Sequence, residues 1–272
     1  MRIGSDEHKR LFCNMLLDSF DPYKPAVIDW PKLSEDDLRR LAGLPFWQVA
    51  VETEGHASAT MQAAADGTSD PLIREALALN AFEERRHKEV LHNMLAFYGI
   101  EIGEEPPYPG PRDPEWAYIR TGYGECFDSF FAFGLFAVAK HSGFFPPALV
   151  DVFEPIIQEE ARHILFFVNW LAYVGAGRPR WRQPVFLARR GYALATKAAS
   201  RLRLARGADA NSDMTLRGHK AIGVSLSPGR FIDLCLRENE RRMARYDERL
   251  LRPQALPRLV KLARPFLGGR QS

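Results

Sequence analysis

Apolar residues recur at spacings of three and four along most of the chain, a pattern that predicts helices. Alternation of apolar and polar residues, which would indicate β-strands, is rare between residues 40 and 180. Four long helical segments stand out, with Pro near their starts and Gly near their ends. They span roughly residues 45–66, 71–99, 114–142 and 147–175. We therefore expect an all-α protein built on a four-helix bundle.

Shorter segments flank these four helices. Two N-terminal helices and three basic C-terminal helices are predicted at about 5–20, 34–41, 184–206, 228–251 and 256–267. The stretch 99–114 is too rich in Gly and Pro to be helical, and 207–229 is a long polar connection typical of a loop. The expected organisation is an N-terminal helical segment packing on the bundle, the bundle itself and a basic helical extension (1–44, 45–177 and 178–272).

The two halves of the predicted bundle are related by a repeat. "EERRH" occupies residues 83–87 and "EEARH" occupies residues 159–163, 76 positions later. A Gly precedes a Pro by four residues in each half, and each Pro precedes the second Glu of its pentapeptide by 13. The repeat indicates two similar helical hairpins and makes chance a poor explanation of the two pentapeptides.

Each pentapeptide places a Glu and a His three residues apart, on one face of a helix. Glu84 and His87 share an otherwise largely apolar stripe, and so do Glu160 and His163. Such a stripe faces the core, where carboxylates and imidazoles need protons or cations to compensate them. Oxygen and nitrogen ligands of this kind suit iron or manganese. The pattern therefore predicts a metal site inside the bundle.

The other two long helices are expected to supply further acids. In the first, helical periodicity favours Glu54, whereas the offset of 76 pairs Glu52 with Asp128, so Glu52 stays an alternative. In the third, Glu125 and Asp128 share a face within a run of Phe and Ala. Glu125 is the favoured ligand and Asp128 the alternative. The Phe run itself is interpreted as core in preference to a substrate pocket.

The arginines of the pentapeptides have two interpretations. Arg86 and Arg162 can steer the metal ligands from behind, as a second shell. The favoured alternative is an i,i+3 ion pair on the helix flank, with Glu83 for Arg86 and with Glu159 for Arg162.

Composition and charge limit the kind of protein and the cellular location in which such a site is expected. The net charge of +3 hides an asymmetry, because residues 178–272 hold 22 Lys/Arg against 7 Asp/Glu and the rest holds 15 against 27. The three cysteines are far apart, which argues against disulfides and zinc knuckles. The polar, charged start argues against a secretion signal, and the longest apolar run is too short to span a bilayer. A cytoplasmic location is expected.

The order Glu, Glu-x-x-His, Glu, Glu-x-x-His over residues 45–175 resembles the ferritin-like di-iron carboxylate superfamily. The resemblance implies two iron ions, with mixed manganese and iron or manganese alone as alternatives. It implies that Glu84 and Glu160 bridge or chelate the metals and that each histidine binds one of them. The implied ligands are Glu54, Glu84, His87, Glu125, Glu160 and His163.

The same resemblance implies a reaction class. The leading expectation is an oxidase or oxygenase that uses O₂ on a small organic substrate, with no catalytic residue beyond the metal ligands. The alternatives are a ferroxidase, iron-handling or peroxide-scavenging protein and, ranked last, a tRNA hydroxylase-like RNA modification enzyme. Segments 104–114 and 207–229 are candidates for a lid over the site. A homodimer is compatible with the predicted bundle. The basic extension is expected to pack on the acidic bundle or to contact a membrane surface, RNA or protein.

Overall fold

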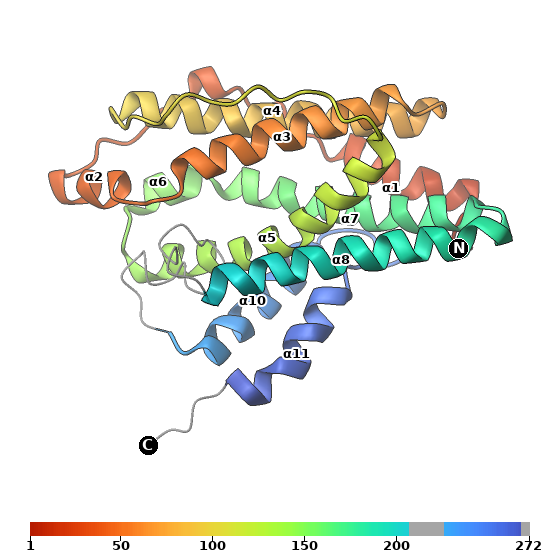
Figure 1. The fold of residues 1–272 in the computed structure, drawn as a ribbon. Coiled ribbons are helices and arrows are strands. Elements are labelled where there is room, and N and C mark those ends of the chain that lie inside the picture. Colours follow the sequence, from red (N-terminus) through yellow and green to blue (C-terminus); the bar gives the residue numbers. More distant parts are fainter. Residues whose placement is uncertain (207–225, 268–272) are drawn as a thin grey trace.

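The structure, a computed structural model, describes residues 1–206 and 226–267 (Figure 1). All regular elements in these residues are helices, so the all-α prediction is confirmed. The α-helices are α1 Asp6–Asp18, α2 Glu35–Ala42, α3 Trp47–Asp66, α4 Pro71–Phe97, α5 Pro114–Ser142, α6 Pro147–Val152, α7 Glu154–Gly177, α8 Gln183–Arg206, α10 Pro228–Met243 and α11 Ala255–Leu267. Two short 3₁₀ helices cover Pro25–Val27 (η1) and Arg180–Arg182 (η2).

Helices α3, α4, α5 and α7 form the bundle. A short turn joins α3 to α4, and these two helices lie side by side as a hairpin, with α5 and α7 beneath them in the view of Figure 1. Helix α5 contacts both α3 and α7, and α7 contacts α4. This arrangement is compatible with a ferritin-like bundle.

Capping residues explain where two of the bundle helices begin. The Asp70 side chain accepts hydrogen bonds from the backbone N–H groups of Leu72 and Ile73, and the Asp113 side chain accepts one from the N–H of Trp116. A proline occupies the first position of α4 and of α5, where no intrahelical N–H partner is lost. These starts agree with the sequence-based prediction.

Two predicted helices are shorter than expected. The fourth long helix is divided at Phe153, so that α6 ends at Val152 and α7 starts at Glu154. Pro155 explains the break, because proline cannot donate to the carbonyl four residues earlier and disfavours helical backbone before it. The predicted helix 228–251 ends at Met243. Beyond it the Asp247 side chain accepts from the backbone N–H of Arg249, a local bond that competes with helix.

The terminal segments pack against the bundle. Helix α1 lies across α4 and α7, α8 lies on α5, and α10 contacts α5 and α7. Ion pairs tie the basic extension to the acidic bundle, as expected from their opposite charges. The pairs are Arg178–Glu115, Arg189–Asp113, Arg201–Asp128 and Arg242–Glu154.

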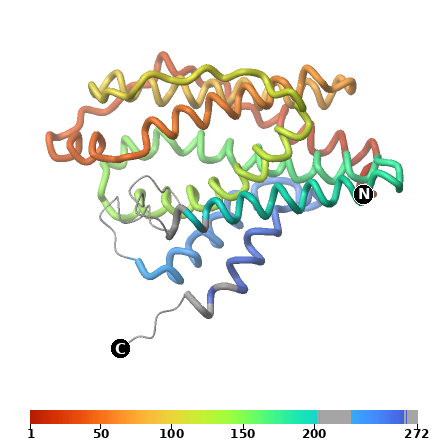
Figure 2. Tube along the Cα trace, viewed as in Figure 1, coloured from red at the N-terminus to blue at the C-terminus, as the bar shows by residue number. Residues whose placement is uncertain are grey.

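The Pro-rich segment before α5 runs along the outside of the α3–α4 hairpin (Figure 2). Its Tyr108 ring lies in a notch at Gly55, where an added Cβ would come within 2.4 Å of the ring. Glu105 in the same segment pairs with Lys88 at 2.5 Å and His92 at 2.6 Å. The first lid candidate, 104–114, is thus fastened to the hairpin. Most of the second, residues 207–225, lies outside the described residues.

The core is divided into two main apolar clusters along the bundle. One gathers side chains such as Val90, Phe127 and Phe130, and the other gathers side chains such as Met61 and Phe166. The Phe residues of α5 belong to the core, as the sequence indicated. Over the described part of the chain, no helix combines the length and apolarity needed to cross a bilayer.

Candidate metal centre

Four of the predicted ligands come together between three helices. Glu54 extends from α3, Glu84 and His87 from α4, and Glu160 from α7. One ligand atom from each lies within 4.8 Å of the others. Glu84, His87 and Glu160 are buried, whereas Glu54 is half-buried. The bundle therefore concentrates three carboxylates and one imidazole at a single point.

The imidazole nitrogens that face this point lack hydrogen bonds. His87 Nδ1 lies 3.2 Å from Glu160 Oε1 and 3.6 Å from Glu54 Oε2, but neither contact has hydrogen-bond geometry. His163 Nδ1 lies 2.9 Å from Glu84 Oε1, again without hydrogen-bond geometry. Because unsatisfied polar atoms are costly in a core, these inward atoms fit a site that a cation completes.

The outward nitrogens are held by the other pentapeptide. His87 Nε2 is 2.8 Å from Glu159 Oε2, and His163 Nε2 is 2.8 Å from Glu83 Oε2. A carboxylate on Nε2 favours the tautomer that carries its proton there, leaving the Nδ1 lone pair free. The first Glu of each motif therefore presents the histidine of the opposite motif for metal binding.

The arginines complete the same crossed arrangement. Arg86 donates to Glu159 at 2.6 Å and Arg162 donates to Glu83 at 2.5 Å. The corresponding pairs within one helix are longer, at 3.7 Å and 3.6 Å, and all four side chains are buried. The predicted i,i+3 pairs are therefore present, but they are buried instead of lying on the helix flank, and the shorter pairs cross to the opposite helix. The helical i,i+3 rule considered one helix alone, whereas burial of α4 against α7 brings the opposite carboxylate closer.

The N-terminal segment covers the two arginines. Arg162 donates to the Leu16 carbonyl at 3.2 Å and to Ser19 Oγ at 3.1 Å. Arg86 donates to the Asp21 carbonyl at 2.5 Å, and its guanidinium stacks 3.8 Å from the centre of the Tyr23 ring. The end of α1 and the following loop therefore close the site from behind, a role that no local sequence signal marked.

Burial and charge shift the pKa values of the cluster in opposite directions. Burial alone would lower the pKa of His163, but the negative charge of the neighbouring Glu84 and the hydrogen bond with Glu83 raise it to about 10. Burial raises the pKa of Glu54 to about 8 even though His87 partly offsets it. Burial also favours neutral Glu84, yet the charge of His163 outweighs it and lowers the pKa to about 2. Protons therefore balance the charges where no metal is bound.

The remaining candidate ligands lie around this group. Glu125 on α5 lies outside the group of four, but burial and the charges of Glu84 and Glu160 raise the pKa of its carboxyl well above the ordinary range. The alternative Glu52 accepts a hydrogen bond from Gln48 Nε2 at 2.6 Å, and the alternative Asp128 pairs with Arg201. The structure thus brings Glu54 rather than Glu52 to the cluster.

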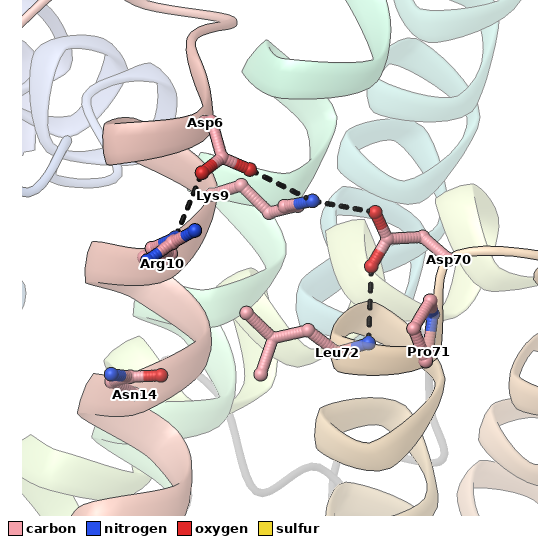
Figure 3. Close-up of a pocket in the computed structure, with 7 residues that line it drawn as sticks. All are labelled: Asp6, Lys9, Arg10, Asn14, Asp70, Pro71 and Leu72. Atoms are coloured by element: carbon pink, nitrogen blue, oxygen red, sulfur yellow. Dashed lines mark hydrogen bonds and ion pairs between the residues drawn. The ribbon is translucent and has the colours of Figure 1, made fainter.

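A polar surface pocket between α1 and the start of α4 lies apart from this site (Figure 3). Lys9 Nζ bridges Asp70 at 2.7 Å and Asp6 at 3.1 Å across it. Asp70 precedes Glu84 by 14 residues on α4, which places it about 20 Å away. This pocket anchors α1 to the N-terminal cap of α4 and does not reach the candidate ligands.

Comparisons with known proteins returned no relative. No family model, no curated protein and no solved structure matches the chain. Its candidate site therefore rests on the geometry described above: a Glu/His cluster in an all-helical bundle that has the donors to hold a metal ion.

Proposed function

We propose that this chain is a member of the ferritin-like di-iron carboxylate superfamily, and that it is an oxidase or oxygenase acting on a small organic substrate with O₂. One observation carries the proposal: buried carboxylates and two inward Nδ1 atoms converge from the bundle helices while both Nε2 atoms are held by carboxylates. Structural ion pairs alone would not leave His87 Nδ1, His163 Nδ1 and Glu84 Oε1 without hydrogen bonds.

The donor set fits two metal ions. Glu54, His87 and Glu160 would hold one ion, and His163 and Glu125 would hold the other. Glu84 lies between the two histidines, 3.9 Å from His87 Nδ1 and 2.9 Å from His163 Nδ1, and is placed to serve both. Carboxylate and imidazole ligands suit iron and manganese. We favour iron, with manganese or a mixed pair as the alternatives.

When bound, two reduced irons supply paired electrons for the oxidation of a substrate by O₂. The chain itself supplies the rest. Glu83 and Glu159 hold the two imidazoles in one tautomer and orientation, and the Phe-rich cluster on α5 excludes bulk water. Glu125 is half-buried, and because burial and the charges of Glu84 and Glu160 raise the pKa of its carboxyl, we expect it to release a proton as cations enter.

Metal content per chain tests the site. The protein is purified after growth with iron and manganese, beside Glu84→Ala and His163→Ala, with Glu89→Ala on the exposed face of α4 as the matched control. About two metals per chain in the wild type and the control, lost in both site variants, is the expected result. Equal metal content in all four proteins would overturn the site.

Oxygen consumption then separates the two leading functions. The ferrous-loaded protein is mixed with O₂ and candidate organic reductants, and both O₂ uptake and organic products are followed. Catalytic uptake coupled to an organic product supports the oxygenase. Uptake that stops once the added iron is oxidised, together with a large assembly on gel filtration, would favour iron handling instead.

A further inference from the structure

The segment that follows the bundle is unusually basic. Residues 178–206, which form η2 and α8, contain nine Lys/Arg and no Asp/Glu. Helix α8 lies along α5 at the side of the bundle (Figure 1). Acids of the bundle neutralise three cations of this segment, Arg178, Arg189 and Arg201. Of the others, Arg180, Arg182 and Arg203 are exposed and make the outer surface positive.

One face of α8 packs on the protein. Phe186 and Ala193 are buried, and Lys197 lies across the backbone at Gly124, with its Nζ 3.0 Å from the position of an added Cβ. These residues, together with Arg201, share one side of the helix at spacings of seven, four and four. This side accounts for the attachment of α8 to the bundle, so the opposite side faces away.

The opposite side carries an apolar stripe. Trp181, Val185, Ala188 and Tyr192 follow one another at spacings of four, three and four. Trp181 is 70% exposed, Val185 is 64% exposed and Tyr192 is 63% exposed. The Trp116 ring is near Tyr192, with the ring centres 6.2 Å apart, but it leaves most of the stripe open. A row of Trp, Val and Tyr in water is unfavourable unless something else covers it.

Exposed arginines flank this stripe. The Arg182 guanidinium lies 4.5 Å from the centre of the Trp181 ring. Within the described residues, Arg180, Arg182 and Arg203 are exposed and form no ion pair. The outer side of η2 and α8 therefore combines an aromatic-aliphatic stripe with unneutralised positive charge, and this segment contains no Asp or Glu.

We propose that η2 and α8 together dock this protein on an anionic lipid surface, with the stripe of Trp181, Val185 and Tyr192 in the headgroup region and the flanking arginines on lipid phosphates. Helices that lie in a membrane interface have this composition: Trp, Tyr and aliphatic residues on one side with Arg or Lys beside them. Each cation near an anionic leaflet adds to the attraction. Nucleic acid would use the arginines but not Val185, and a protein partner would be expected to meet some acidic residues on the helix.

Vesicle co-sedimentation tests the proposal. The full chain is mixed with phosphatidylcholine vesicles that contain or lack phosphatidylglycerol, at low and high salt. We expect binding to the anionic vesicles only, weakened by salt, with a blue shift of the tryptophan emission that Trp181→Phe removes. The double variant Trp181→Ser with Tyr192→Ser should bind at least about tenfold more weakly.

Matched controls separate this surface from general effects. Phe97→Ser removes an aromatic residue of α4 that is 55% exposed, and Arg85→Glu reverses an exposed charge on the same helix. Both controls should bind like the wild type, whereas Arg180→Glu with Arg182→Glu should lose binding. Circular dichroism of each variant checks that the helices are retained.

Three outcomes would overturn the proposal. Absence of binding to anionic vesicles by the wild type is the first, and unchanged binding by the Trp181 and Tyr192 double variant is the second. The third is a concentration-dependent dimer that the same double variant abolishes, because the stripe would then be an interface between two copies. None of these results depends on metal content or on the proposed oxidation.

Discussion

The crossed hydrogen bonds behind the metal ligands can be broken by one conservative change, Glu159→Gln. Glu159 accepts from Arg86 at 2.6 Å through one oxygen and lies 2.8 Å from His87 Nε2 through the other. Glutamine keeps the shape but removes the charge, and its NH₂ group must face one of these two donors. Either the guanidinium or the imidazole is then left without its acceptor inside the protein.

The loss of stability depends on the contacts that Arg86 keeps once the Glu159 carboxylate is replaced. Breaking a buried ion pair by removing one charge costs about 3–5 kcal/mol. Arg86 is 2% exposed but retains the Asp21 carbonyl and the Tyr23 ring, so we expect the lower end, about 3 kcal/mol. For a chain of this size that corresponds to a loss of roughly 6–12 °C in Tm. Metal affinity should fall about 10–100-fold, because the imidazole is no longer oriented.

Thermal unfolding of the metal-free protein and metal titration measure the two effects separately. Glu89→Gln is the control, since Glu89 is an exposed glutamate on α4. If Glu159→Gln melts within about one degree of Glu89→Gln, the crossed pair contributes little to stability. If its metal affinity also equals that of the control, Glu159 does not position His87 and the reasoning fails.

Two further predictions concern protonation and packing. Because the pKa of His163 is raised to about 10 and that of Glu54 to about 8, both groups carry protons at neutral pH in the metal-free site. Metal binding should therefore release protons, and the metal affinity should increase as the pH rises. Calorimetric titration in buffers of different ionisation enthalpy measures the proton release. Identical heats of binding in all buffers would contradict the prediction. Gly122→Ala should destabilise by about 1–3 kcal/mol in denaturant unfolding, because the added Cβ would lie 2.2 Å from the Phe167 ring. Gly191→Ala on α8 is the control, because no atom lies within 4 Å of the Cβ that it adds, and it should be neutral or stabilising. Equal losses of stability in the two variants would argue against the close contact between Gly122 and Phe167.

The helices and the ligand faces could be predicted from sequence because both depend on local spacing. Periodicity placed Glu54 on the apolar face of its helix, and the structure brings Glu54 to the cluster while Glu52 binds Gln48. The starts of α4 and α5 followed from an acidic cap and a proline at the first turn. The break at Phe153 followed from Pro155 and was equally local, but the apolar pattern continues through it and concealed it.

Contacts between helices could not be predicted in the same way. The i,i+3 rule describes an isolated helix surface, where Arg86 meets Glu83. Inside the bundle that distance is 3.7 Å, and the carboxylate of Glu159 from the opposite helix lies closer. Nothing along the chain specifies which helix faces α4 at this depth. The contact between Arg86 and the Asp21 carbonyl of the N-terminal loop is even harder to predict, because every residue type has a backbone carbonyl.

These contacts indicate that the repeated pentapeptides position the candidate ligands as well as supply them. In each pentapeptide the second Glu and the His face the site, while the first Glu and the Arg serve the histidine and the carboxylate of the other copy. One motif alone would leave its histidine unheld and its arginine without a carboxylate on the facing helix. Both outcomes are unfavourable in a core, so the two copies stabilise each other. A substitution in either copy should therefore disturb ligands in both halves of the bundle.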